Sequence, residues 1–130
     1  MTLRFAVSPC ILFLALTWQA VPADARLADV VGVSCRMESG GTFLFDVTVA
    51  HSDDGWGHFA DIWQVLGPDG VVLGERILAH PHDTEQPFTR SQSGIKIPSD
   101  INNVTVRAHD KSHGWGGQEI TIDRSHCSGG

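Results

Sequence analysis

Residues 42–50, TFLFDVTVA, alternate between apolar and polar side chains. One parity is apolar from Phe43 to Val49, while the other carries Thr42, Asp46 and Thr48. Because successive side chains of a β-strand point to opposite faces, this period of two predicts a strand with one buried face.

Similar segments follow at regular spacing. Residues 103–109 and 118–124 repeat the alternation, and residues 30–36 and 88–95 do so more weakly. Two apolar runs, 60–66 and 71–79, flank Gly67-Pro68-Asp69-Gly70, in which Pro presets φ and Gly supplies a positive φ, as in a hairpin turn. Seven short strands separated by turns therefore account for the chain from residue 30 onward.

No segment of the chain shows the period of 3.6 that indicates an amphipathic helix. Seven short strands in roughly 100 residues predict an all-β fold, an immunoglobulin-like antiparallel β-sandwich of about seven strands. Trp63 shares the parity of Val65 and is expected in its core.

The first 25 residues have a different pattern. Arg4 precedes a short apolar run from Cys10 to Leu16, and small residues follow at Ala23 and Ala25. This layout predicts a secretory signal peptide over residues 1–25 and a single domain over residues 26–130, in the periplasm or secreted. The apolar run is short for a permanent membrane span, so we expect no stable anchor after cleavage, although an N-terminal anchor is the alternative.

The composition limits which classes of partner are expected. Nine Lys and Arg residues against 15 Asp and Glu residues give a net charge of −6, with no basic patch to neutralise phosphates, so nucleic acid is not an expected partner. Cys35 and Cys127 would remain after signal cleavage, and in an oxidising compartment such a pair is expected to form a disulfide.

The histidines give the main functional signal. If consecutive strands run antiparallel, the loops near residues 51–59, 80–87 and 109–117 share one end of the sandwich. Six of the seven histidines fall in or beside these loops, two per loop: His51, His58, His80, His82, His109 and His113. We expect these six to supply a transition-metal site, and His126 to lie at the opposite end.

Acidic residues accompany the histidines. Asp53, Asp83, Glu85 and Asp110 are expected to accept the second N–H of ligand imidazoles and so to orient them. Imidazoles with some carboxylate suit Zn²⁺ or Cu²⁺ first, with Ni²⁺ or Fe²⁺ as alternatives. Each pair of histidines can equally belong to a hydrogen-bonded His/Asp network without metal.

Two tryptophans occupy matching settings in the same loops, Trp56 in GWGH and Trp115 in HGWGG. Exposed aromatic side chains there could stack on a sugar or a protein partner, or could instead close the top of the core. They motivate an alternative function, a metal-free recognition module that binds a carbohydrate or protein partner through Trp56, Trp115 and Arg90.

The segments HPHDTEQ, residues 80–86, and HDKSHGWGG, residues 109–117, loosely resemble the ligand loops of superoxide reductase. That family holds iron with four histidines and a cysteine on an immunoglobulin-like scaffold, and this resemblance implies a histidine-lined end. No cysteine lies in residues 109–117, so no catalytic role is carried over. The whole chain also resembles small exported bacterial proteins to which no activity is assigned, which supports export alone.

These observations together predict an exported metal-binding protein, acting as a carrier, chaperone or sensor module, for which a periplasmic protein partner is an additional expectation. A metal with an open coordination position could activate water. No nucleophile motif accompanies the histidines, so whether the protein is an enzyme stays open, with the balance against it.

Overall fold

The computed structural model describes residues 27–129, so the predicted signal peptide, residues 1–25, lies outside the described residues. The described chain forms seven β-strands: β1 (Asp29–Met37), β2 (Phe43–Ala50), β3 (Ala60–Leu66), β4 (Val72–Ile77), β5 (Phe88–Ile95), β6 (Asn103–Asp110) and β7 (Ile120–Asp123). One short 3₁₀-helix, η1 (Arg124–His126), follows β7. No helix within residues 27–129 is long and apolar enough to cross a membrane.

The strands form two antiparallel sheets that face each other. One sheet has the order β1-β2-β5, and the other has the order β4-β3-β6-β7. This arrangement confirms the predicted all-β sandwich, and the predicted strand positions differ from the observed bounds by two residues or fewer.

The core forms where the apolar faces of the two sheets meet. In β2 the residues of one parity, from Phe43 to Val49, are buried, while their neighbours are only partly buried. Trp63 of β3 is fully buried, as its parity predicted. Burying these faces supplies the main driving force for the sandwich, at about 25 cal/mol per Å² of apolar surface.

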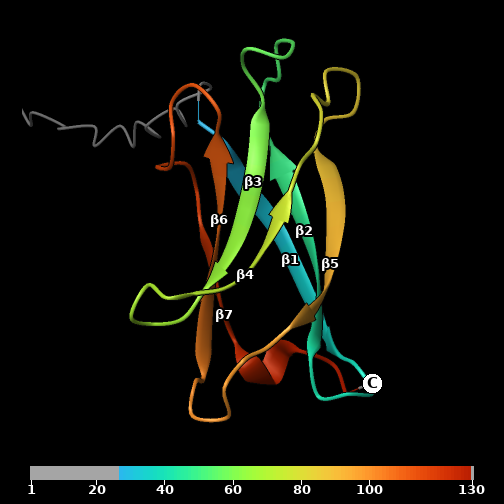
Figure 1. Cartoon of the computed structure of the whole chain (residues 1–130), viewed down its shortest axis with the longest axis vertical. Coiled ribbons are helices and arrows are strands. Elements are labelled where there is room, and N and C mark those ends of the chain that lie inside the picture. The colour runs from blue at the N-terminus through green and yellow to red at the C-terminus, as the bar shows by residue number, and fades with distance from the viewer. Residues whose placement is uncertain (1–26, 130) are drawn as a thin grey trace, which may run out of the picture.

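The two ends of the sandwich differ in what they carry. Loops 51–59, 78–87 and 111–119 lie together at the upper end in Figure 1, where β2, β4 and β6 finish. The lower end carries the other turns, η1 and the C-terminus (Figure 1). The predicted disulfide joins Cys35 to Cys127 near this lower end.

Candidate metal centre

Two core-facing positions meet at the upper end of the sandwich. Asp110 is the last residue of β6 and continues the buried parity of Val106 and Ala108. His51 directly follows β2 and continues the buried parity of Val47 and Val49. Because β2 and β6 belong to opposite sheets, these two polar side chains face each other at the top of the core, and both are fully buried.

His51 lies between two carboxylates. Its Nδ1 atom is 2.5 Å from Asp53 Oδ1, and its Nε2 atom contacts Asp110 Oδ2. The Nε2 atom of His58 reaches the same Asp110 oxygen at 2.8 Å. His51, His58 and Asp110 thus offer three possible ligand atoms that all lie within 4.8 Å of one another.

The second oxygen of Asp110 is held by the following turn. Asp110 Oδ1 accepts hydrogen bonds from the backbone N–H groups of Ser112 and His113, each at 2.7 Å, and lies 3.1 Å from His113 Nδ1. Burial raises the pKa of Asp110, but the hydrogen bonds from the His113 and Ser112 backbone and from His51 outweigh burial and keep this pKa below its ordinary value. Asp110 is therefore a carboxylate at neutral pH.

Asp53 connects the first two loops of this end. Its Oδ1 atom accepts from the Ala60 N–H at 3.1 Å as well as contacting His51, and its Oδ2 atom accepts from the His82 N–H at 2.6 Å. A carboxylate that accepts from Nδ1–H of a ligand histidine leaves Nε2 as the atom that binds the metal. Asp53 thus has the position expected of an orienting residue.

The three atoms suit a metal ion in number and kind. Zinc is bound by imidazole nitrogen at about 2.0–2.1 Å and by carboxylate oxygen at about 2.0–2.2 Å, which spaces tetrahedral ligands by roughly 3.3–3.6 Å. The 4.8 Å limit on the group is compatible with that spacing after small rotations. His113 is the nearest further imidazole, with its ring centroid 5.0 Å from that of His58.

Like His113, the predicted ligands His80, His82 and His109 are not members of this group. His109 lies within β6, in the predicted strand 103–109 and beside the following loop, and its parity is opposite to that of Asp110. Its Nδ1 atom is 2.6 Å from Asp61 Oδ1, and its ring packs against Trp115. His80 and His82 lie in loop 78–87, with ring centroids 4.7 Å apart.

The remaining predicted acids have other partners. Asp83 accepts from the Gly55 N–H at 3.4 Å, and Glu85 pairs with Arg90 through two contacts of 3.2 and 3.1 Å. Of the four acids expected to orient ligands, Asp53 contacts a member of the group and Asp110 is itself a member.

The two tryptophans have unlike surroundings. Trp56 exposes 66% of its surface at the tip of loop 51–59. Trp115 is partly buried, because the guanidinium of Arg107 lies 3.9 Å from its ring centroid and His109 packs beside it. Of these two tryptophans, Trp56 is thus the one available as a large exposed aromatic side chain.

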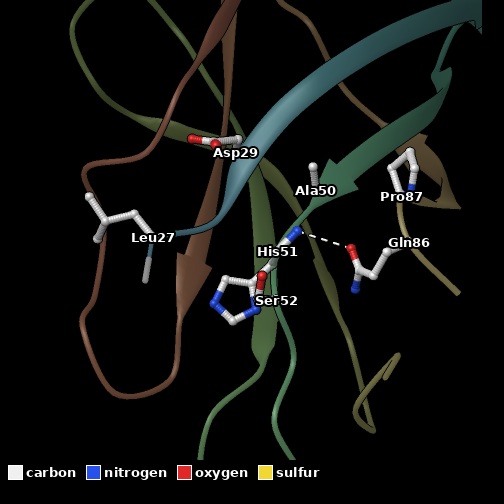
Figure 2. A pocket seen from close by; sticks show the side chains of 7 residues that line it. All are labelled: Leu27, Asp29, Ala50, His51, Ser52, Gln86 and Pro87. Carbon is white, nitrogen blue, oxygen red and sulfur yellow. Dashed lines mark hydrogen bonds between the residues drawn. The ribbon is translucent and has the colours of Figure 1, made fainter. Parts of the chain in front are cut away.

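A pocket of about 420 Å³ lies beside the His51 backbone, lined by Leu27, Asp29, Ala50, His51, Ser52, Gln86 and Pro87. Figure 2 shows the Gln86 side chain turned towards His51, whose N–H it accepts at 3.0 Å. The amide of Gln86 also donates to the His82 carbonyl at 3.0 Å. Gln86 therefore ties loop 78–87 to the start of loop 51–59.

The alternation of buried and exposed positions along β2 and β6 could have identified His51 and Asp110 from the sequence. His51 and Asp110 each extend an alternating strand by one position on its buried side, where a polar residue needs a partner. Assigning residues to loops predicted that six histidines lie at one end. It did not take into account that the side chains of His109 and Asp110 point to opposite faces of β6.

Comparisons with known proteins found one informative similarity. The chain is 45% identical over 100 residues to a protein of Halomicrobium mukohataei described as "Putative lipoprotein", a match that covers 77% of this chain. The chain spans about half the length of that relative, since the match covers 49% of it. No protein-family model and no solved structure matches the chain. The description of the relative and the Cys35–Cys127 disulfide are both consistent with an exported protein.

Proposed function

We propose that this protein is an exported, periplasmic or secreted, metal-binding protein whose site consists of His51, His58 and Asp110, with His113 as a fourth ligand. The observation that carries the proposal is the convergence of two imidazole nitrogens on one buried carboxylate oxygen. Asp53 supports it, because it holds the far nitrogen of His51 as an orienting carboxylate does in metal sites.

The donor set favours a borderline divalent ion. Two histidines with one carboxylate occur in sites for Zn²⁺ and for Fe²⁺, and imidazole also suits Cu²⁺ and Ni²⁺. We propose Zn²⁺ or Cu²⁺ as the ion. Binding is expected to weaken as the pH falls below about 6.5, because ligand imidazoles must be neutral.

A carrier, chaperone or sensor role follows from where the site lies. Two loops on a rigid sandwich, together with the last residue of β6, supply its residues, so binding an ion would link loops 51–59 and 111–119 without changing the sheets. Trp56, exposed two residues before His58, is a candidate contact for a partner that delivers or receives the ion.

The test is metal binding by the tag-free, exported protein. We expect about one tightly held ion by elemental analysis, removable with chelator and restored by Zn²⁺ or Cu²⁺. At free metal 100 times above the dissociation constant, binding should stabilise the fold by about 2.7 kcal/mol, seen as a higher melting temperature.

Two substitutions locate the site. His58→Ala, at a partly exposed position, should abolish this binding event while leaving the fold intact, and Asp110→Asn should do the same with some loss of stability. His126→Ala and Asp100→Asn, at exposed positions away from the group, are the matched controls. Binding to His58→Ala as tight as to the unaltered protein would contradict the site.

The alternative, a recognition module without metal, rests on the exposure of Trp56. It predicts that Trp56→Ala removes binding of a carbohydrate or protein partner while His58→Ala does not. A protein that is purified without bound metal and binds neither Zn²⁺ nor Cu²⁺ would favour this alternative.

A further inference from the structure

The imidazole of His82 is buried without a hydrogen-bond partner. The residue is only 5% exposed, and within residues 27–129 neither Nδ1 nor Nε2 finds a donor or acceptor. The nearest carboxylate oxygen, Asp53 Oδ2, is 3.8 Å from Nδ1, beyond hydrogen-bond distance. Leaving a buried polar group unsatisfied costs about 1–3 kcal/mol, so a ligand that bonds to one of these nitrogens would remove this cost.

The fold holds this ring in place by other means. His82 stacks on Phe88, with ring centroids 3.9 Å apart and planes 10° apart. Its backbone is fixed at both polar atoms, since the N–H donates to Asp53 and the carbonyl accepts from Gln86. The ring is therefore positioned in advance, as a ligand must be for tight binding.

His80 places a second imidazole beside it. The two ring centroids are 4.7 Å apart, and the planes differ by 37°. His80 Nδ1 lies 3.0 Å from the Pro81 carbonyl, which can only accept a hydrogen bond, so Nδ1 is the protonated nitrogen and Nε2 carries a lone pair. His80 is exposed, so a ligand can reach its ring from solvent, and nitrogens bound to one ion lie about 3–4 Å apart.

The surrounding charges allow a cation. Asp53 approaches His82 from loop 51–59, and the positive charge of Arg90 is paired with Glu85.

We propose that His80 and His82 form a second metal site, separate from the His51–His58–Asp110 group, which takes a divalent transition ion with solvent completing its coordination. With two imidazoles as the protein ligands, affinity should follow the general order for nitrogen sites, Cu²⁺ above Ni²⁺ and Zn²⁺. Asp53 lies between the two sites, because its Oδ1 atom contacts His51 and its Oδ2 atom approaches His82.

The experiment counts ions on the tag-free, chelator-treated protein. Cu²⁺ is titrated by calorimetry, native mass spectrometry gives the stoichiometry, and electron paramagnetic resonance reports how many nitrogens bind each Cu²⁺. We expect two ions per chain, of which the weaker shows two imidazole nitrogens.

The variants are His80→Ala, His82→Phe and the control His126→Ala. His80→Ala changes an exposed side chain and should leave the fold intact. It should lower the affinity of the second binding event by about 100-fold or more, because loss of a residue that only orients a ligand already lowers metal affinity by about 10- to 100-fold. His82→Phe keeps a ring on Phe88 and should remove the same event. His126→Ala should bind both ions.

The outcomes separate the two sites. If His80→Ala binds two ions as tightly as the unaltered protein does, the second site is overturned. The second site is also overturned if the unaltered protein binds a single ion and only His58→Ala removes it. If the protein binds a single ion, its loss in His80→Ala and retention in His58→Ala would support the second site and contradict the first. A protein that binds no Cu²⁺ would contradict both.

Discussion

At the scale of single residues, carboxylates organise both ends of this sandwich. Asp53 and Asp110 do so at the upper end by accepting several hydrogen bonds each from neighbouring loops. At the lower end Glu38 has the same role between β1 and β2. It accepts from Ser93 Oγ at 2.6 Å, from the Gly94 N–H at 2.9 Å and from Thr42 Oγ1 at 3.1 Å.

These contacts make stability depend on pH through Glu38. The hydrogen bond from Ser93, followed by that from the Gly94 N–H, lowers the pKa of Glu38. A carboxyl group with a lower pKa in the folded state stabilises the fold above its unfolded pKa, near 4.3, and loses that contribution as the pH falls through the folded pKa. Glu38→Gln should therefore lower the melting temperature at pH 7, and the difference from the unaltered protein should narrow towards pH 3. A difference that does not change with pH would contradict this role.

At the scale of elements, the loop between β6 and β7 packs closely on the start of β1. Val30 N–H donates to the Gln118 carbonyl at 2.8 Å, and Gln118 N–H donates to Asp29 Oδ1 at 2.7 Å. Gly117 lies at the closest approach, because a Cβ atom there would be 1.9 Å from the Ala28 carbonyl oxygen. Residues 111–119, which include His113, thus depend on a glycine for their position.

Gly117→Ala should consequently destabilise the fold by about 2 kcal/mol, the range seen when extra atoms are forced into a packed region. Chemical denaturation of the metal-free protein gives this value directly. Gly40→Ala is the matched control, since a Cβ atom at Gly40 meets nothing within 4 Å. Equal stability of the two variants would show that the loop moves away from β1 at little cost.

At the scale of the whole molecule, the disulfide and the histidine group lie at opposite ends of the sandwich. The disulfide joins β1 to the segment after η1 across 92 residues of sequence, at the end opposite to the histidine group. In the chain-entropy model, closing a loop of this length stabilises the folded state by about 4–5 kcal/mol.

The double variant Cys35→Ala/Cys127→Ala should thus lose about 4 kcal/mol of stability yet bind metal with unchanged affinity wherever it remains folded. Denaturation curves and Cu²⁺ or Zn²⁺ titrations at low temperature measure the two quantities. Loss of metal binding by the folded double variant would show that the two ends are coupled.

The strands, the pairing of the cysteines and the end at which the histidines gather can all be predicted from the sequence. Alternation is a local property, so it located β2, β3 and β6 within two residues, and counting chain reversals assigned the predicted loops near residues 51–59, 80–87 and 109–117 to one end. The same parity placed Trp63 in the core.

Which of those histidines contact one another depends on how the two sheets pack. His51 and Asp110 come together because β2 and β6 lie in opposite sheets that pack face to face, a contact between residues 59 positions apart. His109 turns to the other face of β6, and His82 stacks on Phe88 because its backbone is held by Asp53 and Gln86. These outcomes depend on the packing of sheets and on hydrogen bonds between loops, which a local pattern of residues does not contain.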